Sequence, residues 1–450
     1  MNIYLYTDLK ISPGQLFWHR DLGLLTKDFR SLGHDAWLVV HPATEPNATP
    51  VVPNKLDLPR EQPCVAQQGL PRLSVAGPDS PLPTFAPSHL PTSADSNIKH
   101  PTPKILDAPV IWASPSDVRN PFWWQSRKPD LVILGLWTRP KYDPIRRAAL
   151  SATARVIERA DSDGMRTASC GLINYAKRRF DYFRDRTYRW PAFLSAPASV
   201  LYSLASILAT PWIETRLAKT LKLLPALTVE TPQANELWEK LAIKLGVGPT
   251  RIHFIPHPVQ TDIFKPDPAI SKKKQIISVG RWNSYQKNLP LLIETLTAFL
   301  RDNPSWTALI VGSGLSQIRP HPGIFFSSPL TPAELARRMQ ESKVVLSTSR
   351  YESFGLAIAE ALCCGCTPCG PDELDSLVYF DSIFMNRNLP ACRASLCERL
   401  SIISRQESPQ GAAEKAGAIF SPHKIAGEIL NISKNLRRSK PIDSSFSCLP

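Results

Sequence analysis

Short apolar segments that alternate with longer amphipathic segments restrict the fold more than any other feature of this sequence. In the second half of the chain the apolar segments are Gln275–Gly280, Thr307–Gly314, Gly323–Ser328 and Lys343–Ser349, and helical patterns cover Pro290–Leu300 and Pro332–Ser342. Strands this short and this apolar are buried on both faces, and the helices between them supply the cover. The second half therefore predicts a parallel sheet with helices on both faces.

The first half predicts a sheet of the same kind. Residues Asn2–Thr7 alternate apolar and polar side chains, a helical pattern follows to Ser31, and Asp35–Val40 is the next apolar run. Further strands are expected within Val110–Ser114, Pro129–Trp137, Arg155–Gly164 and Leu224–Glu230, and then a helix that starts at Pro232, with Thr231 as its N-cap. A chain of 450 residues exceeds one ordinary core. We expect an α/β fold with an N-terminal domain over 1–258, a C-terminal domain over 259–425, and a helix and tail over 426–450.

The segment from about 42 to 109 differs in composition from the rest. It holds 15 of the 44 prolines and one aromatic residue, Phe85. Such a composition buries little apolar surface. We predict an irregular insertion.

The charge balance points to anionic partners. The formal net charge is +14 and the isoelectric point is about 9.4, which favours phosphates, acidic lipid headgroups or nucleic acid. No recognised nucleic-acid module accompanies the basic residues, so we expect no nucleic acid. The start MNIYLYTDLK reads as a strand rather than a signal peptide, and the nine cysteines fit a reducing compartment. The expected location is therefore the cytoplasm.

The cysteine cluster CCGCTPC allows two interpretations. Cys363, Cys366 and Cys369 have a spacing that occurs in metal sites. A structural zinc site needs four ligands, and no second Cys or His pair lies nearby in the sequence. Close packing of small side chains explains the cluster as well.

Residues 171–222 form a second unusual segment. Its first part interleaves Lys and Arg with aromatic residues, and an uncharged apolar stretch follows up to Glu214. Pro197 and Pro211 limit an uninterrupted apolar helix to the 13 residues between them, fewer than the ~20 that cross a bilayer. The segment either packs within the N-terminal domain or lies on an anionic membrane surface; amphipathic composition does not decide between the two.

Two glutamates and two cations are the candidate functional residues of the second half. Glu360 is the single charged residue within the apolar helical run Phe354–Cys364, and Glu352 precedes it by eight residues. Burying a carboxylate costs several kcal/mol unless a partner binds it; that partner is a ligand or a neighbouring Arg. Arg281 and Lys287 follow the strand Gln275–Gly280 and can together bind a diphosphate.

These residues carry a resemblance. The run ESFGLAIAE, with VGRWNSYQK before it, LIVGSG between them and EALCCGCTP after it, resembles the retaining GT-B glycosyltransferases of family 4 over about Gln275–Pro371. The resemblance implies two Rossmann-like domains that face each other across a cleft, with the acceptor on the N-terminal side and a nucleotide sugar on the C-terminal side.

The resemblance also implies roles for individual residues. Arg281 and Lys287 would bind the donor diphosphate, Glu352 the donor sugar, and Glu360 the ribose. Ser353, Phe354 and Gly355 would contact the donor, as would Gly14 in the first strand–helix loop, although the family's usual double glycine is absent there.

The chain departs from the family in two places. His257-Pro258 replaces a common Asn-Gly pair, which we expect to change the hinge rather than the chemistry. The family's acceptor-side His is absent, and Asp161 and Asp163 follow the corresponding strand. One of them is a candidate to orient acceptor or donor sugar; an Asx turn ahead of a helix is the alternative. The same triplet matches the Asp-x-Asp of metal-dependent GT-A enzymes, but the C-terminal motifs outweigh it.

The expected activity is retaining transfer of a hexose-type sugar from a UDP-, GDP- or ADP-linked donor to a glycan or lipid-linked acceptor. Arg281 and Lys287 would neutralise the leaving group, so we expect neither metal nor cofactor. The alternatives are an epimerase or phosphorylase on the same scaffold, or a non-catalytic protein that binds membranes or polyanions.

Overall fold

The computed structural model describes residues 1–11, 21–42, 110–315, 322–371, 375–384, 396–406 and 411–436. Several residues with sequence-based predictions lie outside these ranges. They are Gly14, the Pro-rich segment after Pro42, and the tail beyond residue 436.

A seven-stranded parallel sheet forms from the first half of the chain, in the order β3-β2-β1-β4-β5-β6-β7. Its strands are β1 (Asn2–Ile11), β2 (Asp35–Pro42), β3 (Val110–Trp112), β4 (Leu131–Gly135), β5 (Val156–Ala160), β6 (Ala226–Val229) and β7 (Ile252–Phe254). The predicted strands are confirmed, and β1 runs four residues beyond the predicted end at Thr7.

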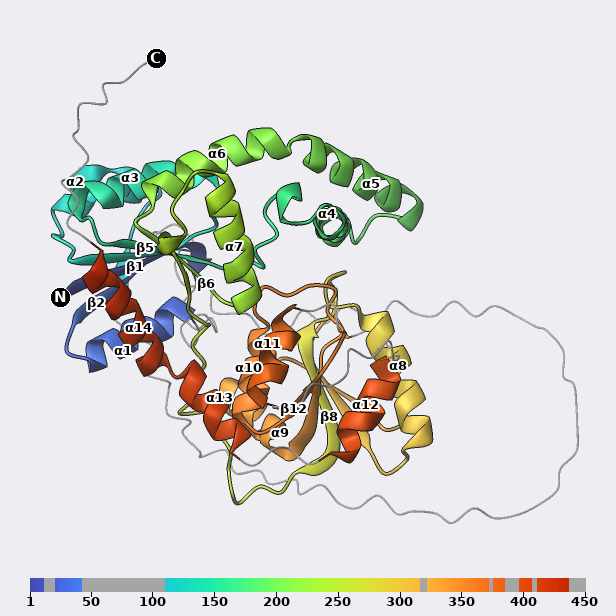
Figure 1. The fold of residues 1–450 in the computed structure, drawn as a ribbon. Helices are drawn as coiled ribbons and strands as arrows, with labels where there is room; N and C mark the ends of the chain where they lie inside the picture. Colours follow the sequence, from blue (N-terminus) through green and yellow to red (C-terminus); the bar gives the residue numbers. More distant parts are fainter. Residues whose placement is uncertain are drawn as a thin grey trace, which may run out of the picture. The chain divides into compact units, whose positions relative to one another are not determined.

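Helices cover both faces of this sheet (Figure 1). One face packs against α1 (Asp21–Ser31) and α14 (Pro422–Asn435), so a helix from the end of the chain completes the first core. The other face packs against α2 (Pro121–Gln125) and α3 (Asp143–Ala152), and α6 (Thr210–Leu223) and α7 (Pro232–Lys244) pack beside β6 and β7. Thr231 caps α7 as predicted, because its hydroxyl accepts from the amide of Ala234 at 3.2 Å.

The second sheet has five parallel strands in the order β10-β9-β8-β11-β12. They are β8 (Lys273–Arg281), β9 (Thr307–Ser313), β10 (Ile324–Ser327), β11 (Ser342–Leu346) and β12 (Thr367–Cys369). Helices α8 (Leu289–Asp302) and α12 (Leu396–Arg405) cover one face. The other face packs against α9 (Pro332–Glu341), α10 (Leu356–Cys363), α11 (Asp375–Phe384) and α13 (Ala412–Phe420). Two parallel sheets, each covered on both faces, confirm the predicted α/β class.

The cysteine cluster packs inside the second core. Cys363, Cys364, Cys366 and Cys369 are each at most 2% exposed. Burial raises the pKa of the Cys363 and Cys364 thiols well above the usual range, which keeps them protonated. Lys272 lies beside them, and its Nζ donates to the carbonyls of Met339, Ser342 and Cys364 at 2.8–2.9 Å. These cysteines pack as small apolar side chains.

The segment 171–222 folds as three helices, α4 (Leu172–Arg186), α5 (Ala192–Leu208) and α6 except for its last residue. The predicted limit of 13 residues is wrong, because α5 has 17 residues and contains Pro197. The ring sits in the second turn, where only one backbone hydrogen bond is lost. Among the described residues no single helix has the length and apolar composition of a membrane span; α5 and α6, bent by 60°, meet those criteria as a pair.

The apolar side chains of α5 point outward. Four serines, Ser195, Ser199, Ser203 and Ser206, form its buried face. Ser203 donates to the carbonyl of Ala176 on α4 at 2.8 Å, and Ser206 accepts from Arg179 at 3.3 Å. The exposed face carries Phe193, Leu194, Val200, Leu201, Leu204 and Leu208. We call these six residues the apolar face of α5.

A buried ion pair holds the loop that follows β4. Arg146 of α3 and Glu158 of β5 are both inaccessible to solvent, and Arg146 Nε lies 2.6 Å from Glu158 Oε2. The same guanidinium donates to the carbonyls of Trp137 and Arg139 at 3.0 and 2.9 Å. Arg146 therefore fixes the backbone from which Arg139 projects.

We predict that Arg146→Met destabilises the protein by about 3–5 kcal/mol, because Glu158 would remain buried without its partner. The double variant Arg146→Met/Glu158→Leu should recover part of the loss, since no charge is left buried. Urea unfolding curves of the three proteins measure both effects. Equal midpoints for wild type and Arg146→Met would contradict the assignment.

Candidate active site

The loops after β8 and β11 meet at one edge of the second sheet. The two strands are neighbours, and the chain order reverses there, since β9 lies on one side of β8 and β11 on the other. In open α/β sheets ligands bind at such a switch point, beyond the carboxyl ends of the strands. The fold thus places Arg281, at the end of β8, and Glu352, in the loop after β11, at an expected ligand-binding edge.

A cavity of about 870 Å³ lies at this edge, and we call it the large cavity. The second sheet contributes Arg281, Lys287, Glu352, Ser353, Phe354 and Gly355 to its lining, and the first half of the chain contributes Trp137, Arg139, Asp161, Asp163, Arg178 and His257. Six of the seven C-terminal residues predicted to contact the donor, all except Glu360, are therefore brought together on one cavity with both candidate aspartates.

Lys287 and Glu352 form an ion pair across the two loops. Ser349 donates to Glu352 Oε1 at 2.6 Å, and the Gln286 amide donates to the Tyr351 carbonyl at 2.9 Å. Both charged side chains are mostly buried, at 18% and 11% exposure. The pair holds a cation and a carboxylate at the same point of the cavity wall, where a phosphate would compete with Glu352 for the ammonium group.

The first turn of α10 faces the same cavity. Gly355 is its N-cap, with φ of +87°, a left-handed conformation that other residues adopt only with strain. No side chain caps the helix, and residues 355–358 line the cavity. Amide groups at a helix start attract anions, and Arg281 lines the cavity from the end of β8.

Glu360 lies deeper than the cavity lining. It is 3% exposed on α10, and the lining reaches only to Ile358 on this helix. The structure therefore places Glu360 beside the wall and not on its surface.

The two aspartates after β5 have different surroundings. Asp163 accepts from the amide of Met165 at 3.1 Å, which is an Asx turn, and it forms an ion pair with Arg178. The Arg178 guanidinium in turn stacks 3.6 Å above the Tyr351 ring. Asp163 is thus engaged in local structure, whereas Asp161 is exposed to the cavity.

His257 belongs to a charged cluster that the sequence did not reveal. Its Nε2 lies 2.5 Å from Glu230 Oε1, and its Nδ1 lies 3.3 Å from Asp21 Oδ1. Arg159 approaches Asp21 within 3.4 Å. The expectation that His257 affects only a hinge did not anticipate these contacts. The sequence did contain one signal for this cluster. Arg159, Glu230 and His257 all lie at or just after the carboxyl ends of neighbouring strands.

The cluster shifts the pKa of each member. Burial by itself would lower the pKa of His257, but the Glu230 and Asp21 carboxylates overcome it and raise the pKa to about 10. Burial raises the pKa of Glu230 to about 7, against the opposing effect of His257. Although burial opposes its ionisation, His257 and Arg159 lower the pKa of Asp21 to about 2. His257 is therefore a cation at neutral pH, paired with the carboxylates of Glu230 and Asp21.

Comparison with known proteins identifies the domain that carries the second sheet. Residues 259–369 match the family model of the glycosyl transferases group 1. Over 176 residues the chain is 26% identical to the GDP-mannose:cellobiosyl-diphosphopolyprenol alpha-mannosyltransferase of Xanthomonas campestris, an alignment that covers 36% of this chain and 44% of that protein. The chain thus matches less than half the length of this relative.

Solved structures agree on the fold of both halves. AviGT4, a glycosyltransferase involved in avilamycin A biosynthesis, superposes with a TM-score of 0.52 at 11% identity and 97% coverage of both chains. Anabaena HepE in complex with UDP and glucose has a TM-score of 0.50 at 13% identity, with 96% of this chain and 97% of that chain covered. The fold is that of the GT-B glycosyltransferases, and the match to the group 1 family model is confined to residues 259–369.

The cluster around His257 predicts a pH-dependent stability. The pKa of His257 is raised on folding from about 6.5 to about 10, so its contribution is complete below the lower value and disappears as pH rises through the upper one. We expect His257→Gln to lower the thermal unfolding midpoint at pH 7, with a difference from wild type that shrinks toward about pH 10. A difference that stays constant over this range would contradict the assigned charge.

Proposed function

We propose that the chain is a retaining glycosyltransferase that moves a hexose-type sugar from a nucleotide sugar to a lipid-linked glycan. One observation supports this most directly. The group 1 domain places Arg281, the Lys287–Glu352 pair and the start of α10 on one cavity. Two cations and a helix start form a binding site for a diphosphate, and the carboxylate beside them can bind sugar hydroxyls.

In the proposed reaction the donor diphosphate lies against Arg281, Lys287 and the first turn of α10. The bond between the sugar carbon and the diphosphate breaks as the acceptor oxygen bonds to the same face of that carbon. The leaving phosphate takes the acceptor's proton. Glu352 holds the sugar, and cationic groups of the protein stabilise the charge that develops on the diphosphate, without a metal.

The proposed acceptor follows from the sequence relative. That relative transfers mannose to a cellobiosyl-diphosphopolyprenol, by its name. For this chain we propose an acceptor glycan on a lipid diphosphate, and a role in the synthesis of cell-surface polysaccharide or glycolipid. The reaction would occur on the cytoplasmic side, where buried free cysteines such as Cys363 and Cys366 stay reduced.

The donor is identified by thermal stabilisation with UDP-, GDP- and ADP-sugars, with GDP-mannose first because of the relative's donor. A ligand at 100 times its Kd adds about 2.7 kcal/mol of stability. The stabilising donor is then incubated with lipid-linked glycans, and the anomeric configuration of the product tests retention. If no nucleotide sugar shifts the unfolding midpoint, the proposed function is wrong.

We predict that Lys287→Ala weakens nucleoside diphosphate binding by roughly tenfold or more, because a charge-assisted contact worth ~1.5–3 kcal/mol is lost. The control is Lys273→Ala at the opposite end of β8, where Lys273 is exposed and pairs with Glu341. Calorimetric titration measures both affinities, and equal losses in the two variants would refute a local phosphate contact.

Glu352→Gln distinguishes the sugar contact from the diphosphate contact. It should lower turnover while nucleoside diphosphate affinity stays within a few-fold of wild type, because the proposed partner of Glu352 is the sugar. Steady-state kinetics and calorimetry on the same samples provide the comparison. A large loss of nucleoside diphosphate affinity would instead mean that Glu352 acts by positioning Lys287.

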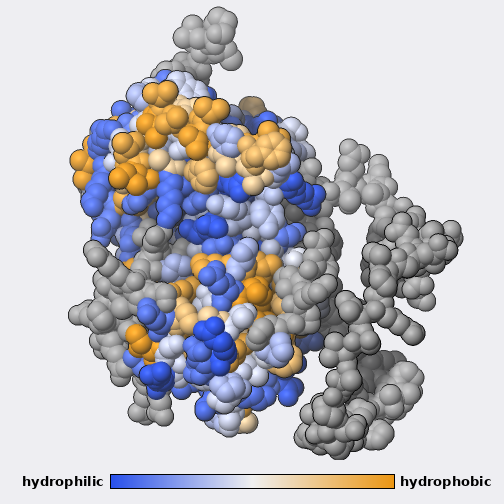
Figure 2. All heavy atoms as spheres, turned by 90° about the vertical axis from the view of Figure 1, so that its right-hand side faces the viewer, coloured by the Kyte–Doolittle hydropathy of each residue, from blue (hydrophilic) through white to orange (hydrophobic). Residues whose placement is uncertain are grey.

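We further propose that the apolar face of α5 lies on a membrane. Figure 2 shows hydrophobic residues gathered where α5 and α6 lie, and Leu201, Leu204 and Leu208 are 67%, 53% and 82% exposed. Contiguous exposed apolar surface of this kind marks an interaction site. Several cations of 177–189 face the protein instead: Arg178 pairs with Asp163, and Arg184 contacts Ser195. The apolar side chains would then supply most of the membrane contact.

The variant Leu201→Ser/Leu204→Ser/Leu208→Ser should lose most binding to vesicles of anionic and neutral phospholipid. Wild-type binding should largely persist in high salt, because apolar contacts are not screened. The control is Ile243→Ser, which removes an equally exposed apolar side chain, at 63% exposure, from α7. Flotation measures binding. Unchanged flotation of the triple variant would exclude α5 as the membrane contact.

A further inference from the structure

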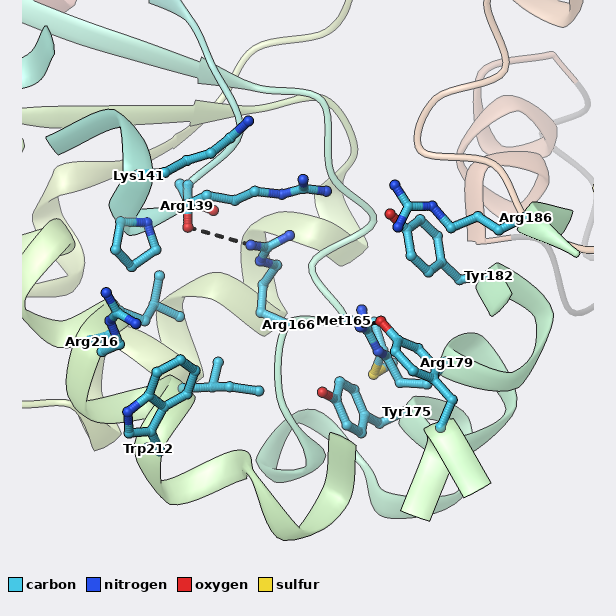
Figure 3. Close-up of a pocket in the computed structure, with 15 residues that line it drawn as sticks. Arg139, Lys141, Met165, Arg166, Tyr175, Arg179, Tyr182, Arg186, Trp212 and Arg216 are labelled. Atoms are coloured by element: carbon cyan, nitrogen blue, oxygen red, sulfur yellow. Dashed lines mark hydrogen bonds between the residues drawn. The ribbon is translucent and has the colours of Figure 1, made fainter. Parts of the chain in front are cut away.

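A second pocket, of about 510 Å³, lies between α4, α6 and the loops after β4 and β5 (Figure 3). We call it the cationic pocket. Six basic residues line it, together with the aromatic rings of Tyr175, Tyr182, Tyr202 and Trp212; the basic residues are Arg139, Lys141, Arg166, Arg179, Arg186 and Arg216. Among the residues that the structure describes, no Asp or Glu belongs to its lining.

The positive charge of this pocket is not balanced by the protein. Within the described part of the chain, none of the six basic residues forms an ion pair with a carboxylate; several stack on aromatic rings instead, as Arg186 does on Tyr182 and Arg216 on Trp212. Asp163, a carboxylate that acts on Arg166 from nearby, is itself paired with Arg178. Gathering like charges in one concave site is unfavourable. An anionic ligand would remove that cost.

Arg166 carries the strongest sign of a missing partner. Its Nε is buried without a hydrogen-bond partner, and its one described hydrogen bond is from Nη2 to the carbonyl of Thr138 at 3.4 Å. Figure 3 shows this side chain near the centre of the labelled cations. Burial lowers its pKa below the usual value, with only partial compensation from Asp163. Buried donor atoms normally have an acceptor, so an acceptor-rich group is expected beside Nε of this half-buried side chain.

The pocket connects two surfaces already described. Arg139, Arg166, Arg179 and Tyr182 line both the cationic pocket and the large cavity, so the two lie next to each other. At the other side the pocket reaches Trp212, which is 61% exposed and follows the apolar face of α5 in the chain. An anion in the pocket would thus lie between the proposed donor site and an exposed apolar surface.

We propose that the cationic pocket binds the diphosphate that joins the acceptor glycan to its lipid. The glycan then extends into the large cavity toward Lys287 and Glu352, and the lipid chain leaves past Trp212 along the apolar face of α5. Arg and Lys side chains supply the donors that phosphate oxygens require. This inference rests on the proposed function, because it assigns the acceptor subsite of the same enzyme.

The test uses the full chain saturated with nucleoside diphosphate, so that the donor site is occupied. Three probes are titrated by calorimetry: a short prenyl diphosphate, inorganic diphosphate, and the prenyl alcohol that lacks phosphate. The variants are Arg186→Gln, Arg216→Gln and their combination, because both residues are exposed and line only the cationic pocket. The matched controls are Arg189→Gln and Lys219→Gln, exposed cations on the same parts of the chain that do not line the pocket.

The prenyl diphosphate should bind most tightly, and the double variant should bind it at least about tenfold more weakly, whereas the two controls leave its affinity unchanged. Wild-type affinity in the double variant would overturn the inference. If the prenyl alcohol binds as tightly as the prenyl diphosphate, the pocket does not recognise the anion. If inorganic diphosphate binds as tightly, the ligand is free diphosphate and not a lipid-linked one.

Nucleoside diphosphate binding by the same variants separates this inference from the proposed function. Arg186 and Arg216 do not line the large cavity, so both variants should keep wild-type donor affinity. A protein that binds no nucleoside diphosphate would contradict the proposed function. Normal donor binding, with prenyl diphosphate affinity insensitive to both substitutions, would contradict the pocket assignment alone.

Discussion

The parallel pairing of β8 with β11 is the constraint on which the site depends. Parallel strands end at the same edge of a sheet, so loops that are about 65 residues apart in sequence meet there. The Lys287–Glu352 ion pair is the local result. It exists because Lys287 follows one strand and Glu352 follows its neighbour, and a different strand order would separate them.

The cations of the chain fall into two groups, those with close partners in the protein and those that gather without an acid. Where cations are structural, the protein itself supplies their partners, as Glu158 does for Arg146 and three backbone carbonyls do for Lys272. Around the cationic pocket the described lining has no acid. In the first arrangement the folded protein stabilises its own cations. In the second, an external anion is needed to neutralise them. Six Lys and Arg residues therefore gather where the proposed acceptor carries phosphate.

Helix α5 reverses the usual placement of polar and apolar residues. A surface helix normally directs its apolar stripe inward, yet Ser199 and Ser203 are buried while Leu201 and Leu204 are exposed. The serines allow close packing on α4 and accept hydrogen bonds from it, as Ser206 does from Arg179. This packing holds Arg179 of α4 against Ser206 and Tyr202 of α5, where Arg179 lines the cationic pocket. One helix pair thus supports both the proposed membrane surface and the proposed acceptor site.

The sequence by itself determined the strands, the parallel sheets and the C-terminal site, because hydrophobic periodicity and strand-end motifs are local properties. Thr231, Arg281, Lys287 and Glu352 could be placed from their neighbours in the chain alone. Only the tertiary structure decided that His257 meets Glu230 and Asp21, that the long apolar segment is one helix with its serines inside, and that Arg139, Arg166 and Arg216 share a pocket. These contacts join residues far apart in sequence, and each depends on how helices pack across a sheet, which no local pattern encodes.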